Sequence, residues 1–154
     1  MKLKESFVTH KNKDDYMMID ATGEFSGLVH SNVGDSMMPL IKQGRDVLVI
    51  SAVNGRLKRY DIPLYKRDSG QYVLHRILKV RKNDYVICGD NRCNKEYGIT
   101  DRHIIGVLSG IIRDGREIPV TDIKCRIYAH LWCDLFPVRV LIIRIRQIFK
   151  RRLK

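Results

Sequence analysis

The chain has 154 residues, of which 44% are hydrophobic, so it can bury one core but is too short for two independent domains of ordinary size. Its formal charge of +12 would suit a polyanionic partner, yet seven basic residues and no acid fall within residues 139–154, and the rest of the chain is only mildly basic. The spacing of the four cysteines matches neither a compact disulfide framework nor a common zinc site, so we expect reduced thiols, no metal and no other cofactor.

The first twenty residues contain several lysines but no continuous apolar segment. A cleavable secretory signal needs such a segment, and an N-terminal membrane anchor needs a longer one. We therefore expect the chain to begin in the cytoplasm.

The middle of the sequence predicts short strands separated by turns. Val, Ile, Leu and Tyr dominate these segments, and Asn-Gly, Ser-Gly, Asn-Asp and Asp-Gly pairs separate them. This spacing favours a largely antiparallel β domain, and Asp114-Gly115 predicts a hairpin turn within residues 110–117. The predicted strands are 46–52, 60–65, 71–80, 84–88 and 103–112.

After Pro119 the hydrophobic pattern changes to a helical period, and Pro137 is expected to end a first helix. A second helix is predicted from Val138 onward, with one apolar stripe that arginines flank. The chain thus divides into a β domain, residues 1–120, and a helical extension, residues 121–154. The apolar residues that define the helices are Ile123, Ile127, Leu131 and Leu135, preceded by Thr121 or Asp122 as N-cap, and then Val138, Leu141, Ile142, Ile145, Ile148 and Phe149.

No segment offers about 20 consecutive apolar residues, so no simple transmembrane helix is expected. Residues 138–154 have the composition of a helix that lies in a membrane interface and is attracted to anionic lipid. The alternative is that the apolar stripe packs on the β domain while its arginines face water. Both alternatives are compatible with a cytoplasmic protein, which the first would make peripheral at a membrane.

Three short segments together indicate chemistry: residues 34–41 (GDSMMPLI), 74–77 (LHRI) and 89–92 (GDNR). Each alone has an ordinary structural explanation, as a turn serine, a buried strand histidine and a Gly-Asp-Asn turn. In this order and at these intervals they resemble the signal-peptidase superfamily, whose members share a G-x-S-M-x-P segment with the nucleophile, a strand with the base, and a later G-D-N turn. The resemblance extends over residues 33–118.

This resemblance implies a serine endopeptidase that removes signal or leader peptides from precursors bound in an extended conformation. It also implies a mainly β fold, an antiparallel, partly open barrel of the signal-peptidase type, here with a C-terminal helical extension. Ser36 occupies the nucleophile position and His75 the base position. A histidine there is similar to the branch found in archaea and the endoplasmic reticulum, whereas the bacterial branch uses lysine. The lack of a visible anchor favours removal of a leader from a small peptide precursor.

The Ser36 hydroxyl becomes a competent nucleophile only when a base lies within about 2.6 to 3.2 Å of its oxygen. Ser36 and His75 are distant in sequence, so the fold has to bring them together. An unperturbed imidazole has a pKa of about 6.5 and is mostly neutral at neutral pH. On that basis activity is expected to fall below about pH 6, because His75 then becomes protonated.

An imidazole base needs a partner on its other nitrogen, which fixes the tautomer and stabilises the imidazolium. Asp90 and Glu96 are both candidates to orient His75. In the endoplasmic-reticulum branch an acid lies seven residues after the glycine of G-D-N, and Glu96 occupies that place. Asp90 has the alternative role of shaping the turn.

Substrate binding is expected around the Ser36 segment. As the resemblance implies, the backbone N–H of Ser36 is the first donor to the oxyanion. Gly34 lets the substrate approach the main chain closely, and Met37 and Pro39 fix the segment that presents Ser36.

Of two rival functions, the sequence disfavours the first and leaves the second open. A self-cleaving regulator of the LexA type would need an Ala-Gly or Cys-Gly bond upstream of Ser36 and a lysine base, and the sequence has neither. A catalytically inactive protein with the peptidase fold would bind a membrane surface or a peptide partner. Specific nucleic-acid binding is not expected, because the basic tail has no aromatic residue besides Phe149 and no groove-reading module.

Overall fold

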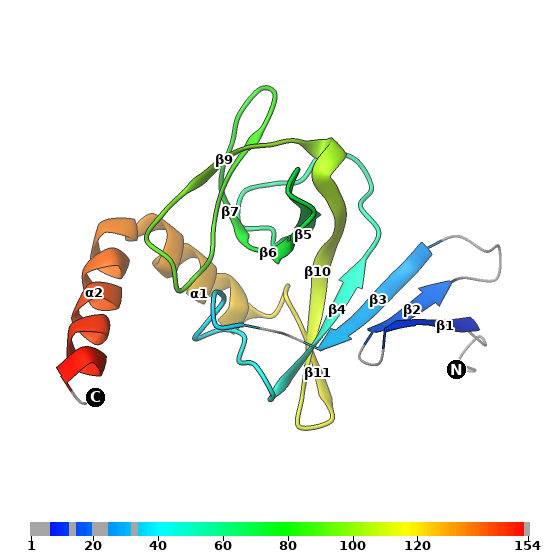
Figure 1. Ribbon diagram of the computed structural model, residues 1–154, viewed down its shortest axis with the longest axis horizontal. Helices are drawn as coiled ribbons and strands as arrows, with labels where there is room; N and C mark the ends of the chain where they lie inside the picture. Colours follow the sequence, from blue (N-terminus) through cyan, green and yellow to red (C-terminus); the bar gives the residue numbers. More distant parts are fainter. Residues whose placement is uncertain (1–6, 13–14, 20–24, 32–33, 153–154) are drawn as a thin grey trace.

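A computed structural model describes residues 7–12, 15–19, 25–31 and 34–152 (Figure 1). Strands occupy the described chain as far as Pro119, and two helices follow, so the prediction of a mainly β protein with a helical C-terminal part is confirmed. The strands are β1 (Phe7–Asn12), β2 (Asp15–Ile19), β3 (Phe25–Ser31), β4 (Asp46–Ser51), β5 (Pro63–Lys66), β6 (Tyr72–Leu74), β7 (Arg76–Val80), β8 (Tyr85–Cys88), β9 (Glu96–Ile99), β10 (Ile104–Arg113) and β11 (Arg116–Pro119). The helices are the short 3-10 helix η1 (Asp101–His103), α1 (Ile123–Asp134) and α2 (Phe136–Arg152).

The described strands form two antiparallel sheets. The larger has the order β1-β2-β3-β4-β10-β5-β6, with β11 also paired to β10, and the smaller has the order β7-β8-β9. In Figure 1 the strands around β5 and β6 curl into a half-barrel, whereas β1–β3 extend away beside β4. The predicted hairpin turn lies between β10 and β11, where Asp114 and Gly115 both have positive φ angles, of 51° and 73°.

Strand β5 joins the two hydrophobic cores, because successive side chains of a strand point to opposite faces. Leu64 belongs to the core of the larger sheet, and Tyr65 to the core that also contains the inward side chains of the smaller sheet. The first core consists of Met37, Ile41, Leu48, Ile50, Ile62, Leu64, Leu108 and Ile111. The second consists of Leu57, Tyr65, Ile77, Tyr85, Ile87 and Ile99.

The prediction of a single strand over residues 71–80 is wrong at one position. The segment divides at His75: β6 pairs with β5 in the larger sheet, and β7 pairs with β8 in the smaller one. The apolar pattern continues across the break, but the hydrogen-bonding partner changes, which a local pattern does not reveal. His75 therefore lies where the chain passes between the two sheets.

The remaining differences concern element ends. The predicted strand over residues 60–65 begins only at Pro63, because Tyr60 has a φ of 78° and lies in a turn. Of the two N-cap candidates it is Asp122 that caps α1, its carboxylate accepting the Lys124 N–H at 2.9 Å. Helix α1 ends at Asp134, shortly before Pro137 as predicted, and Pro137 itself lies in the first turn of α2, where its missing N–H would have had no intrahelical acceptor. Strands β1–β3 and β9 were not predicted.

Candidate active site

Ser36 and His75 meet beside Gly89. A β-carbon added to Gly89 would lie 2.8 Å from the carbonyl oxygen of Ser36 and 2.9 Å from Nε2 of His75. Both residues also line one cavity of about 310 Å³. The structure thus brings the two residues that the sequence proposes as nucleophile and base to the same glycine and the same cavity.

The turn formed by residues 89–92 fastens the serine segment in place. The Asn91 N–H donates to the Ser36 carbonyl at 2.7 Å, and the Asn91 side-chain amide donates to the Asp35 carbonyl at 3.1 Å. The Arg92 guanidinium pairs with the Asp35 carboxylate at 2.6 Å. The G-D-N-R segment therefore supports the Ser36 segment and is not an unrelated turn.

The expected substrate-binding residues differ in where they lie. Gly34 lines the cavity beside Ser36 and has a φ of 107°, which favours glycine. Met37 is 2% exposed and packs in the first core, as expected of a residue that fixes the segment. Pro39 is exposed to solvent, and neither Met37 nor Pro39 lines a cavity that contains His75. A substrate-contacting role is thus supported for Gly34 alone.

Tyr65 is the partner of the other imidazole nitrogen. Its hydroxyl oxygen lies 3.3 Å from Nδ1 of His75, and the same hydroxyl donates to Oε2 of Glu96 at 3.0 Å. Because the single phenolic hydrogen is used towards Glu96, the oxygen is left to accept the Nδ1–H of His75. Nε2 then keeps its lone pair, which is the tautomer that a base for Ser36 needs.

Glu96 is kept ionised by Arg67. The guanidinium donates to both carboxylate oxygens, at 2.9 and 2.5 Å. Burial by itself would raise the pKa of Glu96, but the hydrogen bonds from Arg67 and Tyr65 outweigh it and lower the pKa below the usual range. Glu96 thus reaches His75 through Tyr65 and supplies the negative charge behind the imidazole.

Burial lowers the pKa of His75 to about 4, and the nearby charge of Glu96 only partly opposes this. The imidazole is accordingly neutral at neutral pH and can accept a proton. The expectation of a loss of activity near pH 6 assumed an unperturbed imidazole, and the desolvated site moves that expectation towards pH 4.

Asp90, the other candidate to orient His75, is engaged elsewhere. Its fully buried carboxylate accepts two hydrogen bonds from Arg76, at 2.9 and 2.8 Å, and one from the Tyr128 hydroxyl at 3.2 Å. The geometry therefore favours Glu96, acting through Tyr65, over Asp90 as the acid behind the base. Asp90 instead ties the 89–92 turn to β7 and α1.

Side chains of both helices bind the turn formed by residues 89–92. The Trp132 indole on α1 donates to the Asp90 carbonyl at 2.8 Å. On α2, Nη2 of Arg139 donates to the carbonyls of Gly89 and Arg92, at 2.5 and 2.8 Å, and the side chain is 1% exposed. Among the described residues, Nε and Nη1 of Arg139 find no hydrogen-bond acceptor. The helical extension is thus part of the support of the site.

Sequence reasoning missed Tyr65, Arg67 and Arg139. A weak signal existed for the first two, because residues two apart at the end of a strand project to the same side. Arg139 gave no comparable signal, because in the sequence it is one of several arginines that flank the apolar stripe of the second helix.

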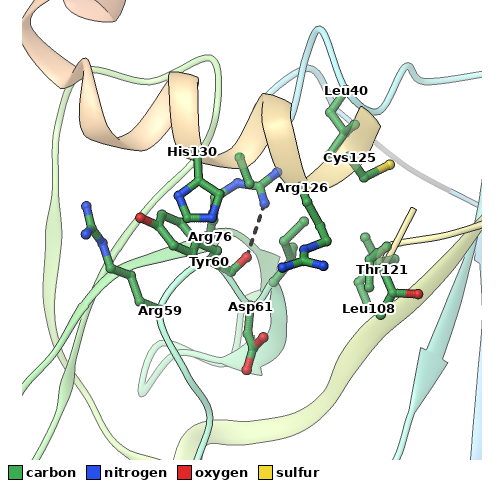
Figure 2. A pocket seen from close by; sticks show the side chains of 13 residues that line it. Leu40, Arg59, Tyr60, Asp61, Arg76, Leu108, Thr121, Cys125, Arg126 and His130 are labelled. Atoms are coloured by element: carbon green, nitrogen blue, oxygen red, sulfur yellow. Dashed lines mark hydrogen bonds between the residues drawn. The ribbon is translucent and has the colours of Figure 1, made fainter. Parts of the chain in front are cut away.

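A separate cavity lies between α1 and the larger sheet (Figure 2). It has a volume of about 260 Å³, and its lining includes Arg76, Tyr60 and His130 but neither Ser36 nor His75. Figure 2 shows Arg76 reaching the Tyr60 carbonyl, a hydrogen bond of 3.1 Å. Within the described residues no group of three or more His, Cys, Asp or Glu side chains could hold a metal ion, and all four cysteines carry free thiols.

No protein-family model matches this chain, and comparisons with curated proteins and with solved structures give no match either. The resemblance to signal peptidases accordingly depends on the three sequence segments and on the geometry that joins them.

Proposed function

We propose that this protein is a serine endopeptidase of the signal-peptidase type, with Ser36 as nucleophile and His75 as general base. One observation carries the proposal. The Ser36 carbonyl and His75 Nε2 both lie within 3 Å of the point where a β-carbon of residue 89 would stand, and Nδ1 of the same imidazole faces a hydroxyl that is itself bound to a carboxylate.

The arrangement would act in the following steps. His75 Nε2 takes the hydroxyl proton of Ser36 as the oxygen attacks the carbonyl carbon of the scissile bond, and Tyr65 and Glu96 stabilise the imidazolium. The backbone N–H of Ser36 donates to the developing oxyanion. His75 then returns the proton to the leaving amine, and a water molecule, activated by the same imidazole, hydrolyses the acyl-enzyme.

Strand β6 is the surface along which a precursor would lie. It is the last strand in the order of the larger sheet, and its residues line the 310 Å³ cavity together with Ser36. The free backbone groups of an edge strand can pair with an extended peptide. We therefore propose that a signal or leader segment adds to β6 in an extended conformation, with its scissile bond at Ser36.

The proposal is tested with an unbiased library of precursor-derived peptides, with products identified by mass spectrometry. The wild type is expected to cleave a subset of the library, and Ser36→Ala and His75→Ala are expected to lose that cleavage. Ser69→Ala and His130→Ala are the matched controls, because both residues are exposed and lie outside the cavities that contain His75. Equal cleavage by all variants, or none by the wild type, would favour the inactive, peptide- or membrane-binding alternative.

We also propose that the protein works in the cytoplasm, peripherally bound to an anionic membrane surface. The supporting observation is the outward face of α2. Leu141, Ile145 and Ile148 are 58%, 43% and 53% exposed, while the opposite side of the helix packs on the body through Arg139 and Ile143. This exposure argues against the alternative in which the stripe packs on the β domain.

The charges around this face fit an anionic bilayer. Arg144 and Arg146 flank the apolar stripe, and α2 contains no acidic residue. Helix α1 leaves a second apolar row exposed, at Ile123, Ile127, Leu131 and Leu135. Neither helix of the described chain is long and apolar enough to cross a membrane. An amphipathic helix of this kind binds in the interfacial layer.

The test is co-sedimentation with vesicles of phosphatidylglycerol and phosphatidylcholine, compared with phosphatidylcholine alone. The wild type is expected to bind the anionic vesicles, and an Ile145→Gln, Ile148→Gln double variant to lose most of that binding. Ile105→Gln is the control, because it removes an exposed apolar side chain from β10. Equal binding by all three proteins, or a dimer in which the same face is buried, would contradict the proposal.

A further inference from the structure

The catalytic pair lies in a groove made of two connected cavities. The 310 Å³ cavity beside Ser36 and a larger one of about 550 Å³ share Arg67, His75 and Arg92 in their walls. The larger cavity is completed by residues 91–96 and by Arg144 and Gln147 of α2. A peptide that enters at Ser36 therefore continues past His75 into this second part of the groove.

The second part of the groove contains no aliphatic side chain and has an excess of positive charge. Its one carboxylate, that of Glu96, is bound to Arg67 and Tyr65. Lys95 contacts the ring of Phe136, with Nζ 4.4 Å from the ring centre. Among the described residues, neither Lys95 nor Arg144 has a carboxylate within ion-pairing distance.

Arg92 adds a third cation at the boundary between the two cavities. Its guanidinium is paired with Asp35, but both side chains are about half exposed, at 46% and 55%. An exposed ion pair of this kind is weak and exchanges readily with a competing carboxylate. A groove with an excess of positive charge concentrates anionic groups, because its low-dielectric walls focus the field.

We propose that this groove selects peptides with acidic side chains near the scissile bond, at the positions that occupy the Lys95 and Arg144 part of the groove. The inference rests on the proposed function, because it identifies the substrate class of the same site. An acidic peptide is preferred to a free phosphate or lipid headgroup because the basic cavity is continuous with the cavity that holds Ser36.

The binding test uses the Ser36→Ala protein, so that it does not depend on cleavage. Fluorescence anisotropy is measured with two labelled Ala/Ser-based peptides that differ only in having Glu or Gln at the same positions. The Glu peptide is expected to bind at least about tenfold more tightly, and to lose that advantage as NaCl rises from about 50 to about 300 mM. Lys95→Glu with Arg144→Glu should abolish the preference, whereas Arg116→Glu on β11 should preserve it.

Equal affinity for the two peptides, a preference unaffected by the Lys95 and Arg144 reversals, or displacement of the Glu peptide by equimolar glycerol phosphate would overturn the inference. Cleavage assays separate its failure from failure of the proposed function. If the wild type cleaves Glu and Gln substrates equally, the peptidase stands and the charge selection is refuted. If the wild type and Ser36→Ala both leave them intact while the Glu preference persists, the acidic-peptide site stands and the peptidase is refuted.

Discussion

The hydroxyl oxygen of Tyr65 lies 3.3 Å from Nδ1 of His75 and connects the imidazole to the carboxylate of Glu96. In a Ser-His-Asp triad the acid contacts the histidine directly. Here the buried Tyr65 phenol lies between the Glu96 carboxylate, which Arg67 binds, and the His75 imidazole.

Replacing Tyr65 with phenylalanine is expected to reduce kcat by roughly tenfold to a hundredfold, because Nδ1–H loses its acceptor and the imidazolium its stabilising partner. KM should change little, since the ring and its packing are retained. Nitrogen NMR of His75 in the Ser36→Ala background checks the cause: Nδ1–H should dominate with Tyr65 present and not with phenylalanine. An unchanged tautomer together with unchanged kcat would contradict the role of Tyr65 as the hydrogen-bond partner of His75 Nδ1.

Replacing Asp90 with asparagine is expected to lower the free energy of unfolding by about 3 to 5 kcal/mol, because it leaves the buried Arg76 guanidinium without its counter-charge. Urea denaturation measures the loss. Glu96→Gln should cost far less, since Glu96 is only part-buried, but should reduce kcat. A larger loss of kcat in folded Asp90→Asn than in Glu96→Gln would indicate that Asp90, and not Glu96, is the acid that serves the base.

The pH profile of kcat/KM is expected to be flat from neutral pH down to about pH 5 and to fall on further acidification, with an apparent pKa near the value of about 4 that burial gives His75. The value of kcat/KM falls on acidification because the base works only when neutral. A lowered pKa keeps the imidazole neutral to a lower pH. Circular dichroism at each pH separates this loss from unfolding. A midpoint at pH 6.5 would mean that the imidazole is solvated in the free enzyme.

Replacing Gly89 with alanine is expected to reduce kcat about a hundredfold, because the added methyl group would overlap the Ser36 carbonyl and the His75 ring and push the pair apart. Gly110→Ala is the matched control. Its β-carbon would also be crowded, at 2.7 Å, but only by the flexible Glu117 side chain, and neither residue lines a cavity that contains His75. Comparable activity of the two variants would contradict the placement of Ser36 beside His75.

The sequence predicted the strands and helices better than the site. Strands β4, β8 and β10 and the hairpin at Asp114-Gly115 follow from local apolar patterns and turn residues, and the structure contains them. The break at His75 was not predictable, because both sides of it have strand-forming residues and only the tertiary pairing differs. For the same reason the hydrogen bonds that connect Glu96, Tyr65 and His75 were not predictable. The three residues come from different segments, and no spacing along the chain relates them.

Different sides of helix α2 support the 89–92 turn, line the groove and face outward. Arg139 secures the carbonyls of the 89–92 turn, Arg144 forms a wall of the groove, and the exposed stripe faces outward. Removing this helix is therefore expected to take away the support of the 89–92 turn, and with it that of the Ser36 segment, together with any lipid contact. Two hydrogen bonds connect α2 to Ser36 through this turn, one from Arg139 to the Gly89 carbonyl and one from the Asn91 N–H to the Ser36 carbonyl, so a displacement of the helix at a membrane is expected to shift the Ser36 segment.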